Sequence, residues 1–383
     1  MSTLLDANTF RELVSGHRRG LGAATVRGLL NLLEFPYFSL TRLRNFLYDS
    51  GVFPTHRLPI PIISVGNLTL GGTGKSPLVA WIGRFFLDQG IQPGMISRGY
   101  GQSSNGVNDE FLELAFRLPS IPHRLNRNRV AAAQDFLNSQ NIELLILDDA
   151  FQHRRIHRNL DIVLLDALEP FGYEHIFPRG MLRESITALR RADVVFLSRA
   201  DWVDEPQRRK IRDRVMALSP NILWGEIVHE PQSLVSIPKR EREMKTEMET
   251  QTKTEMKTQM KTQTNTETKT TIETDISAIR DKRILAFCGI GNPNAFHQTL
   301  ENCGAHIIEL VPFPDHHQFK TEDLDELEKI AKRENVDSIL CTMKDFVKIE
   351  RIASGSIPIQ AVLINVRFLS GETAFRKLLT KQL

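Results

Sequence analysis

The clearest chemical signal in the sequence is a glycine-rich segment, Gly66-Asn-Leu-Thr-Leu-Gly-Gly-Thr-Gly-Lys-Ser-Pro77. Glycines allow successive backbone N–H groups to face phosphate oxygens, a lysine adds a cation for the terminal phosphates, and a serine hydroxyl can bind Mg²⁺. The strict P-loop pattern G-x-x-x-x-G-K-[ST] would place glycine where the sequence has Thr69. A glycine-rich turn without a ligand is the alternative. We expect a variant P-loop whose nucleotide-binding residues are Gly71, Gly72, Thr73, Gly74, Lys75 and Ser76.

A pair of carboxylates, Asp148 and Asp149, directly follows the apolar run Leu144-Leu-Ile-Leu147. Ligands of a doubly wound sheet bind at the carboxyl ends of its strands, so these carboxylates would lie beside the P-loop. Phosphoryl transfer requires Mg²⁺ on the phosphates, and an acidic residue there can hold the ion or its waters. The pair is therefore a candidate metal site, with a structural pair that caps the next helix as the alternative.

Several cations stand near these carboxylates in the sequence. A dense polar stretch follows them, and Arg129 and the dipeptide Arg183-Glu184 are further candidates, although exposed charges are ambiguous when taken alone. Beside a nucleotide site, such cations would bind the phosphate of a substrate. A nucleic-acid-binding ATPase is disfavoured, because aromatic residues do not alternate with the basic ones. The polar stretch comprises Gln152, His153, Arg154, Arg155, His157 and Arg158.

The elements that must position these residues are indicated by short apolar runs that alternate with helical or loop segments. A strand over 61–66 would lead into the glycine-rich turn, and a helix over 77–90 would follow it. This alternation predicts an α/β fold of the P-loop NTPase type, with a doubly wound, mostly parallel sheet covered by helices on both faces. Further strands are expected over 94–97, 143–148, 162–166 and 194–198, and in a second, smaller α/β domain over 283–289, 305–310 and 338–342.

Composition sets the limits of the domains. The chain has 383 residues, 41% hydrophobic and 25% charged, with a net charge of +3, which is typical of folded globular proteins and names no partner. Residues 239–275 consist almost wholly of Lys, Thr, Glu, Met and Gln, a composition that cannot form a core. We expect an N-terminal amphipathic region over 1–55, a nucleotide-binding domain over 56–230, a low-complexity insertion over 239–275 and a smaller domain over 276–383.

The N-terminal region has leucines and aromatic residues at near-helical spacing over 23–50, and Pro36 is expected to divide them into two helices of a hairpin. Neither piece reaches the roughly 20 apolar residues that a membrane span requires. The hairpin either packs on its own domain or lies at a membrane surface, with Arg42 and Arg44 placed for anionic lipid headgroups. Charged residues interrupt any secretory signal, and three widely spaced cysteines favour a reducing compartment, so a cytoplasmic location is expected.

The motifs together resemble the tetraacyldisaccharide 4′-kinase family, from about Leu29 to the C-terminus apart from the insertion. The resemblance implies an ATP- and Mg²⁺-dependent enzyme that phosphorylates the 4′-hydroxyl of a tetraacyldisaccharide 1-phosphate in lipid A biosynthesis, bound peripherally to the inner face of the inner membrane. It favours the membrane-surface interpretation of the N-terminal region. The resemblance is based on the glycine-rich segment, Ser97-Arg-Gly-Tyr-Gly101, Asp148-Asp-Ala-Phe-Gln-His-Arg-Arg155, Leu182-Arg-Glu184, Phe313-Pro-Asp-His-His317 and Thr342-Met-Lys-Asp-Phe-Val-Lys348.

Roles follow from the resemblance position by position. Asp109 corresponds to the catalytic aspartate of the family, and His316 to its partner. Lys75 and Ser76 correspond to the phosphate and magnesium residues. The metal surroundings would comprise Ser76, Asp148, Asp149 and Glu184, and the contacts with substrate or nucleotide phosphate would comprise Arg129, His153 and Arg183.

A rival interpretation is a P-loop GTPase or metallochaperone-type nucleotide switch. The strand over 193–197 precedes Ser198-Arg-Ala-Asp201, which is similar to the Asn-Lys-x-Asp loop that binds guanine. Only the aspartate of that pattern is present. The nucleotide preference of the protein would separate the two classes, because a switch would bind GDP tightly and show no lipid-dependent turnover.

Overall fold

The computed structural model describes residues 7–99, 109–236, 272–349 and 357–383. It divides into two compact units, of which unit 1 comprises Met1–Glu230 with Asn365–Leu383, and unit 2 comprises Pro231–Ile364. Strands β7 (Leu223–Ser236) and β12 (Ile359–Ser370) each contribute residues to both units. The low-complexity insertion, most of which falls in 237–271, and the end of the Ser97–Gly101 motif lie outside the described residues.

Unit 1 contains a parallel sheet with the strand order β7-β6-β5-β1-β4-β2-β3. The chain fills one side of β1 up to β4 and the other side from β5 onward, so the topological switch lies at β1, where a doubly wound sheet binds its ligand. The predicted strands are confirmed. Their bounds are Ile62–Asn67 (β1), Pro93–Ser97 (β2), Leu144–Asp148 (β4), Leu160–Asp166 (β5) and Val194–Ser198 (β6). The short strand His123–Leu125 (β3), like β7, was not expected from the sequence.

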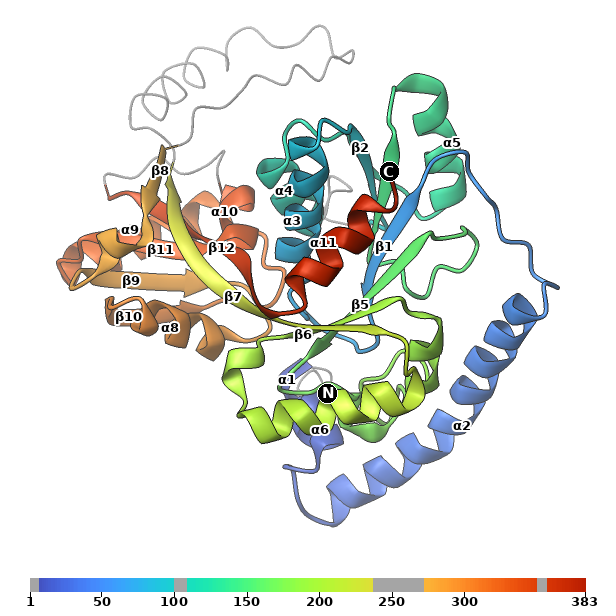
Figure 1. The fold of residues 1–383 in the computed structure, drawn as a ribbon. Coiled ribbons are helices and arrows are strands. Elements are labelled where there is room, and N and C mark those ends of the chain that lie inside the picture. Colours follow the sequence, from blue (N-terminus) through green and yellow to red (C-terminus); the bar gives the residue numbers. More distant parts are fainter. Residues whose placement is uncertain (1–6, 100–108, 237–271, 350–356) are drawn as a thin grey trace, which may run out of the picture. The chain divides into compact units, whose positions relative to one another are not determined.

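Helices cover both faces of this sheet (Figure 1). Alternate residues of β5 face opposite sides, because Ile162 and Leu164 pack in one core cluster while Val163 and Leu165 pack in another. The first cluster includes α3 (Lys75–Asp88) and α11 (Glu372–Thr380), and the second includes α6 (Glu205–Leu218). The other helices of unit 1 are α1 (Ala7–Ser15), α2 (Leu21–Asp49), α4 (Asp109–Arg117) and α5 (Arg129–Ser139), with 3₁₀ turns at Gly172–Glu174, Ile186–Arg191 and Ala200–Trp202.

Unit 2 is the smaller α/β unit that the sequence predicts. Strands β10, β9, β11 and β12 lie in that order and pair in parallel, whereas β8 pairs antiparallel with β7. The new strands are β8 (Ile272–Asp275), β9 (Arg283–Cys288), β10 (His306–Pro312) and β11 (Ser338–Thr342), and the helices are α8 (Pro293–Asn302), α9 (Thr321–Arg333) and α10 (Met343–Ile349), with a 3₁₀ turn at Ile276–Ile279.

The N-terminal helices differ from the expectation in where they divide. Pro36 lies inside α2, and the break falls between α1 and α2, where Gly16 and Gly20 have positive φ angles. Proline removes one helical hydrogen bond, but Pro36 is exposed, so water can solvate the carbonyl that loses its partner. Contacts before and after Pro36 hold the helix to unit 1: the Glu34 carboxylate accepts from Ile176 N at 2.7 Å, and Asn45 Nδ2 donates to Glu184 Oε2 at 2.8 Å.

The end of the chain also differs from the expected boundary. The smaller domain was expected to span 276–383, whereas residues 365–383 belong to unit 1. Phe375 and Leu379 of α11 are fully buried in the core cluster that contains α3. Burial of these side chains against α3 favours the return of the C-terminal helix, and a contact over almost 300 residues leaves no local signal in the sequence.

Candidate functional site

The predicted P-loop connects β1 to α3. Gly74 is the N-cap of α3 and adopts a left-handed conformation, with φ at +75°, which favours glycine. A Cβ atom at this position would lie 1.9 Å from His229 Cε1 on β7, so only glycine fits the space as well. Lys75 and Ser76 then form the first turn of the helix, whose N–H groups and dipole favour an anion. The segment therefore has the geometry of a phosphate-binding loop.

The Lys75 side chain is buried and points toward the end of β4. Its Nζ lies 3.3 Å from Asp149 Oδ1 and donates to Asn67 Oδ1 at 3.2 Å. Asn67 was not among the predicted site residues, although it belongs to the glycine-rich segment. The lysine is thus held in place by a carboxylate and an amide, and a bound phosphate would bring it a second anionic partner.

The two aspartates after β4 have opposite electrostatics. Burial acts to raise the pKa of Asp149, but Lys75 and Arg183, whose Nη1 lies 2.9 Å from Asp149 Oδ2, outweigh it and hold the pKa well below its usual range. Burial and the nearby Glu110 charge raise the pKa of Asp148 to about 7, against the opposing effect of Lys75. Asp149 is consequently an ionised partner for cations, whereas the environment of Asp148 opposes its negative charge.

Arg129 is almost completely buried at the start of α5. Its Nη2 donates to the carbonyl oxygens of Asp148 at 2.5 Å and Asp149 at 3.0 Å. These contacts fix the backbone of the two aspartates, which helps Asp149 to keep its left-handed φ of +47°. A role of Arg129 in contacting phosphate stays a prediction, and the guanidinium has this additional structural task.

Glu184 lies within a buried polar cluster. Its carboxylate accepts hydrogen bonds from Arg191 Nη2 at 2.6 Å, Asn45 Nδ2 at 2.8 Å and Gln152 Nε2 at 3.0 Å. The same Gln152 amide donates to Asn67 O at 2.9 Å, so the cluster links α2 to the strand that precedes the P-loop. Its carboxylate is therefore bonded to a guanidinium and two amides, and its role at a metal stays a prediction.

His153 lies near the arginines of the site. Burial, followed by the charges of Arg129 and Arg158, lowers its pKa to about 4, so the imidazole is neutral at pH 7. A neutral imidazole can donate or accept a hydrogen bond but adds no charge for phosphate binding. The predicted substrate contact by His153 would thus be a hydrogen bond, and it stays untested.

The donor set bears on whether Mg²⁺ fits this site. Within the described ranges, no three His, Cys, Asp or Glu side chains come together as a metal cluster. Mg²⁺ commonly binds through one or two carboxylates together with substrate phosphates and water, so such a cluster is not required. The Ser76 hydroxyl at the helix N-terminus and the buried Asp148 carboxylate fit a site of that kind.

The predicted catalytic residues belong to different units. Asp109 begins α4 in unit 1 and is buried, and its neighbour Glu110 acts electrostatically on Asp148. In unit 2 the two histidines of the Asp315-His-His317 segment differ: His317 Nε2 lies 3.0 Å from Asp323 Oδ2 and its ring stacks on Phe313, whereas the His316 side chain is 64% exposed. Of the two imidazoles, His316 is the one presented to solvent.

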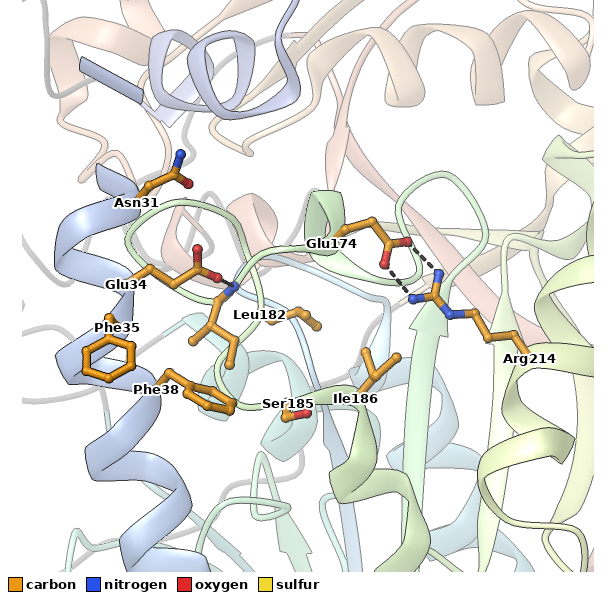
Figure 2. Close-up of a pocket in the computed structure, with 10 residues that line it drawn as sticks. Asn31, Glu34, Phe35, Phe38, Glu174, Leu182, Ser185, Ile186 and Arg214 are labelled. Carbon is orange, nitrogen blue, oxygen red and sulfur yellow. Dashed lines mark hydrogen bonds and ion pairs between the residues drawn. The ribbon is translucent and has the colours of Figure 1, made fainter. Parts of the chain in front are cut away.

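Unit 1 has a surface pocket of about 500 Å³ between α2 and the segment that contains Leu182 (Figure 2). Phe35 and Phe38 of α2 form one wall, and the ion pair between Glu174 and Arg214 lies on the other side. Leu182 also lines the pocket and immediately precedes Arg183, the partner of Asp149. The pocket thus connects the apolar α2 helix with the segment that reaches the phosphate site.

Comparisons with known proteins identify the family. A family model described as tetraacyldisaccharide-1-P 4′-kinase matches residues 26–383. Relatives named tetraacyldisaccharide 4′-kinase include one from Syntrophus aciditrophicus, 33% identical with 88% of each chain covered, and one from Halothermothrix orenii, 30% identical with 89% of this chain and 87% of the relative covered.

A solved structure agrees with this assignment at the level of the fold. LpxK from Aquifex aeolicus, crystallised in complex with ATP, is similar with a TM-score of 0.67 and 24% identity over 93% of this chain and 99% of the other. The family model and the relatives confirm the sequence resemblance and decide for a kinase over the nucleotide switch. The chain belongs to the tetraacyldisaccharide-1-phosphate 4′-kinase family.

Proposed function

We propose that the chain transfers the γ-phosphate of ATP to the 4′-hydroxyl of a tetraacyldisaccharide 1-phosphate. The observation that supports this most directly is the array of Lys75, Asp149 and Arg183 beside the N-terminus of α3. The two cations and the helix N-terminus are suited to the charge that spreads over a transferring phosphoryl group. Gly71, Gly72 and Thr73 would complete the cradle around the phosphates of ATP.

Mg²⁺ is proposed as the metal. It would be held by the Ser76 hydroxyl and by the carboxylates of Asp148 and Asp149, and it would neutralise charge on the phosphates. Although burial raises the pKa of Asp148 to about 7, a cation beside it would favour the ionised form. Glu184 is the weaker candidate, since Arg191 and two amides already occupy its carboxylate.

Asp109 is proposed as the acceptor of the sugar proton, and His316 as the residue that orients it. A hydroxyl proton leaves late in a loose transition state, so a positioned carboxylate suffices as its acceptor. The place of Asp109 in the first turn of α4 supports the role, because the helix dipole favours negative charge there. The two residues belong to different units.

Peripheral binding to the inner face of the inner membrane is proposed through α2. No helix in the described parts of the chain is both long enough and apolar enough to cross a bilayer. Helix α2 nevertheless exposes a set of large apolar side chains, and its Arg42 and Arg44 could contact anionic headgroups. The exposed set is Leu29, Leu32, Leu33, Phe35, Leu40, Leu43 and Phe46.

One assay tests the reaction. The protein is incubated with labelled ATP, Mg²⁺ and a disaccharide 1-phosphate lipid, and transfer of label to the lipid is measured. The Lys75→Ala variant should lose transfer, by several kcal/mol of transition-state stabilisation, while the protein stays folded. Its melting temperature is the control, because Arg183 still pairs with Asp149 after the substitution. Equal loss of folding and of transfer would contradict the proposed role of Lys75.

A further inference from the structure

The loop that presents His316 in unit 2 has an unusual backbone. His316 adopts a left-handed conformation with φ at +61°, which is uncommon for residues other than glycine. Its N–H donates to Gly289 O at 3.2 Å, so the end of β9 holds the loop. A residue with a strained backbone keeps that conformation only when its neighbours fix it. The contacts around Gly289 and His317 therefore decide how His316 is presented.

A buried ion pair of α10 provides these contacts. Asp345 is completely buried, and its Oδ2 accepts hydrogen bonds from Gly289 N at 3.0 Å and from Thr342 Oγ1 at 2.7 Å. Lys348 Nζ lies 2.9 Å from Asp345 Oδ1 and donates to His317 O at 3.1 Å. The carboxylate thus holds the strand end to which His316 is bonded, and the ammonium holds the next residue of the loop.

The close approach of Gly289 agrees with this arrangement. A Cβ atom there would lie 3.2 Å from Asp345 Oδ1, 3.2 Å from Pro314 O and 3.4 Å from His317 Cβ. A methyl group would thus press on both the ion pair and the loop. The strand end, the loop and the carboxylate consequently form one tightly packed unit around the backbone of His316.

Stability alone is a weak explanation for these charges. Desolvation of a buried ion pair offsets much of its attraction, and apolar side chains of similar volume often stabilise a core as well or better. Here the Asp345 carboxylate bonds to the backbone of Gly289, which accepts from His316 N, and the Lys348 ammonium bonds to the backbone of His317. Such bonds specify a conformation, which a nonpolar pair could not do.

We propose that Asp345 and Lys348 are positioning residues that set the backbone of His316, and thereby the orientation of its imidazole. This inference rests on the proposed function, in which His316 orients Asp109. It also assigns a task to the Thr342–Lys348 motif, whose side chains the proposed reaction does not otherwise use. The pair acts through the loop and is not proposed to touch substrate.

Lys348→Met tests the inference, with Lys332→Met on α9 as its matched control. Lys332 also pairs with a carboxylate, Glu328 Oε1 at 2.8 Å, but its side chain is 60% exposed and lies on a different helix. We expect Lys348→Met to lower kcat roughly 10–100-fold, the range expected when a reacting group is misplaced by about 1 Å, with little change in the KM for ATP. The control should retain kcat.

Combination with His316→Ala separates positioning from a general structural role. If Lys348 acts through His316, the double variant should be no slower than His316→Ala, because groups that act as a unit are not additive. The inference would be overturned if the losses of kcat in the two single variants multiply in the double variant, or if Lys348→Met is folded and its kcat is unchanged. If Lys348→Met does not fold, Thr342→Val removes the two hydrogen bonds of its hydroxyl, with Asp345 Oδ2 and Asp345 N, at similar volume. It should give a smaller loss of kcat, which also vanishes when it is combined with His316→Ala.

Different kinetic results would contradict the proposed role of His316 and the positioning role of Lys348. An unchanged kcat in His316→Ala would refute the role of the histidine and, with it, the need to position it. A slow His316→Ala together with a fully active Lys348→Met would refute only the positioning role.

Discussion

Replacement of Asp148 by asparagine should stabilise the nucleotide-free protein while it abolishes catalysis. The Asp148 carboxyl is buried, and burial together with Glu110 raises its pKa to about 7 from an ordinary value of 3.8. A difference of roughly three pKa units corresponds to about 4 kcal/mol between the two protonation states. Because an acid with a raised folded-state pKa destabilises the fold once it ionises, stability is lost as pH rises from about 4 through 7.

The substitution removes this cost and keeps an acceptor for Ser97 Oγ, which donates to Asp148 Oδ2 at 3.1 Å. Since a buried amide keeps a desolvation cost of its own, we expect about 1–3 kcal/mol of added stability at pH 8.5 and less than half of that at pH 5. Calorimetric melting temperatures without Mg²⁺ and nucleotide measure the difference, which should amount to several degrees at the higher pH.

Asp149→Asn is the matched control, with the opposite sign. Because Lys75 and Arg183 hold the pKa of Asp149 below its ordinary value, the stability that this carboxylate contributes is present at neutral pH and is lost on acidification. Asp149→Asn should therefore lower the melting temperature at pH 7. A less stable Asp148→Asn at pH 8.5, or a difference that does not change with pH, would refute the reasoning.

Three further predictions concern catalysis, the insertion and the membrane. Asp109→Ala and His316→Ala should each lower kcat far more than they raise the KM for ATP, and the double variant should be little slower than the slower single variant. Steady-state kinetics of the wild type and the three variants test this, and two defects that multiply would show that the residues do not act as a pair. Deletion of residues 244–270 with a short Gly/Ser linker should leave the melting temperature and turnover nearly unchanged, because the composition of this segment cannot form a core; a marked drop in melting temperature would show otherwise. Leu32→Ser with Phe35→Ser should reduce sedimentation with anionic vesicles and leave the melting temperature unchanged, since both side chains are more than 70% exposed; undiminished sedimentation would exclude this part of α2 as the contact.

Much of unit 1 could be predicted because its signals are local. The strands of a parallel sheet are buried on both faces, so β1, β4, β5 and β6 appear as short apolar runs in the sequence. The conformation of the glycine-rich segment also has a local cause, since Gly74 adopts the left-handed backbone that favours glycine. The family resemblance was likewise contained in short motifs, and the family comparison confirmed it.

The tertiary structure decided what depends on contacts between distant segments. Helix α11 packs in the core beside α3. Helix α2 continues past Pro36, because side chains on both sides of the proline bond to residues about 140 positions away. The tertiary structure also distinguished His316 from His317, which the sequence presents as equal neighbours. These outcomes depend on which surfaces the fold brings together, and the free energy of such contacts is shared between segments whose local sequences do not reveal their partners.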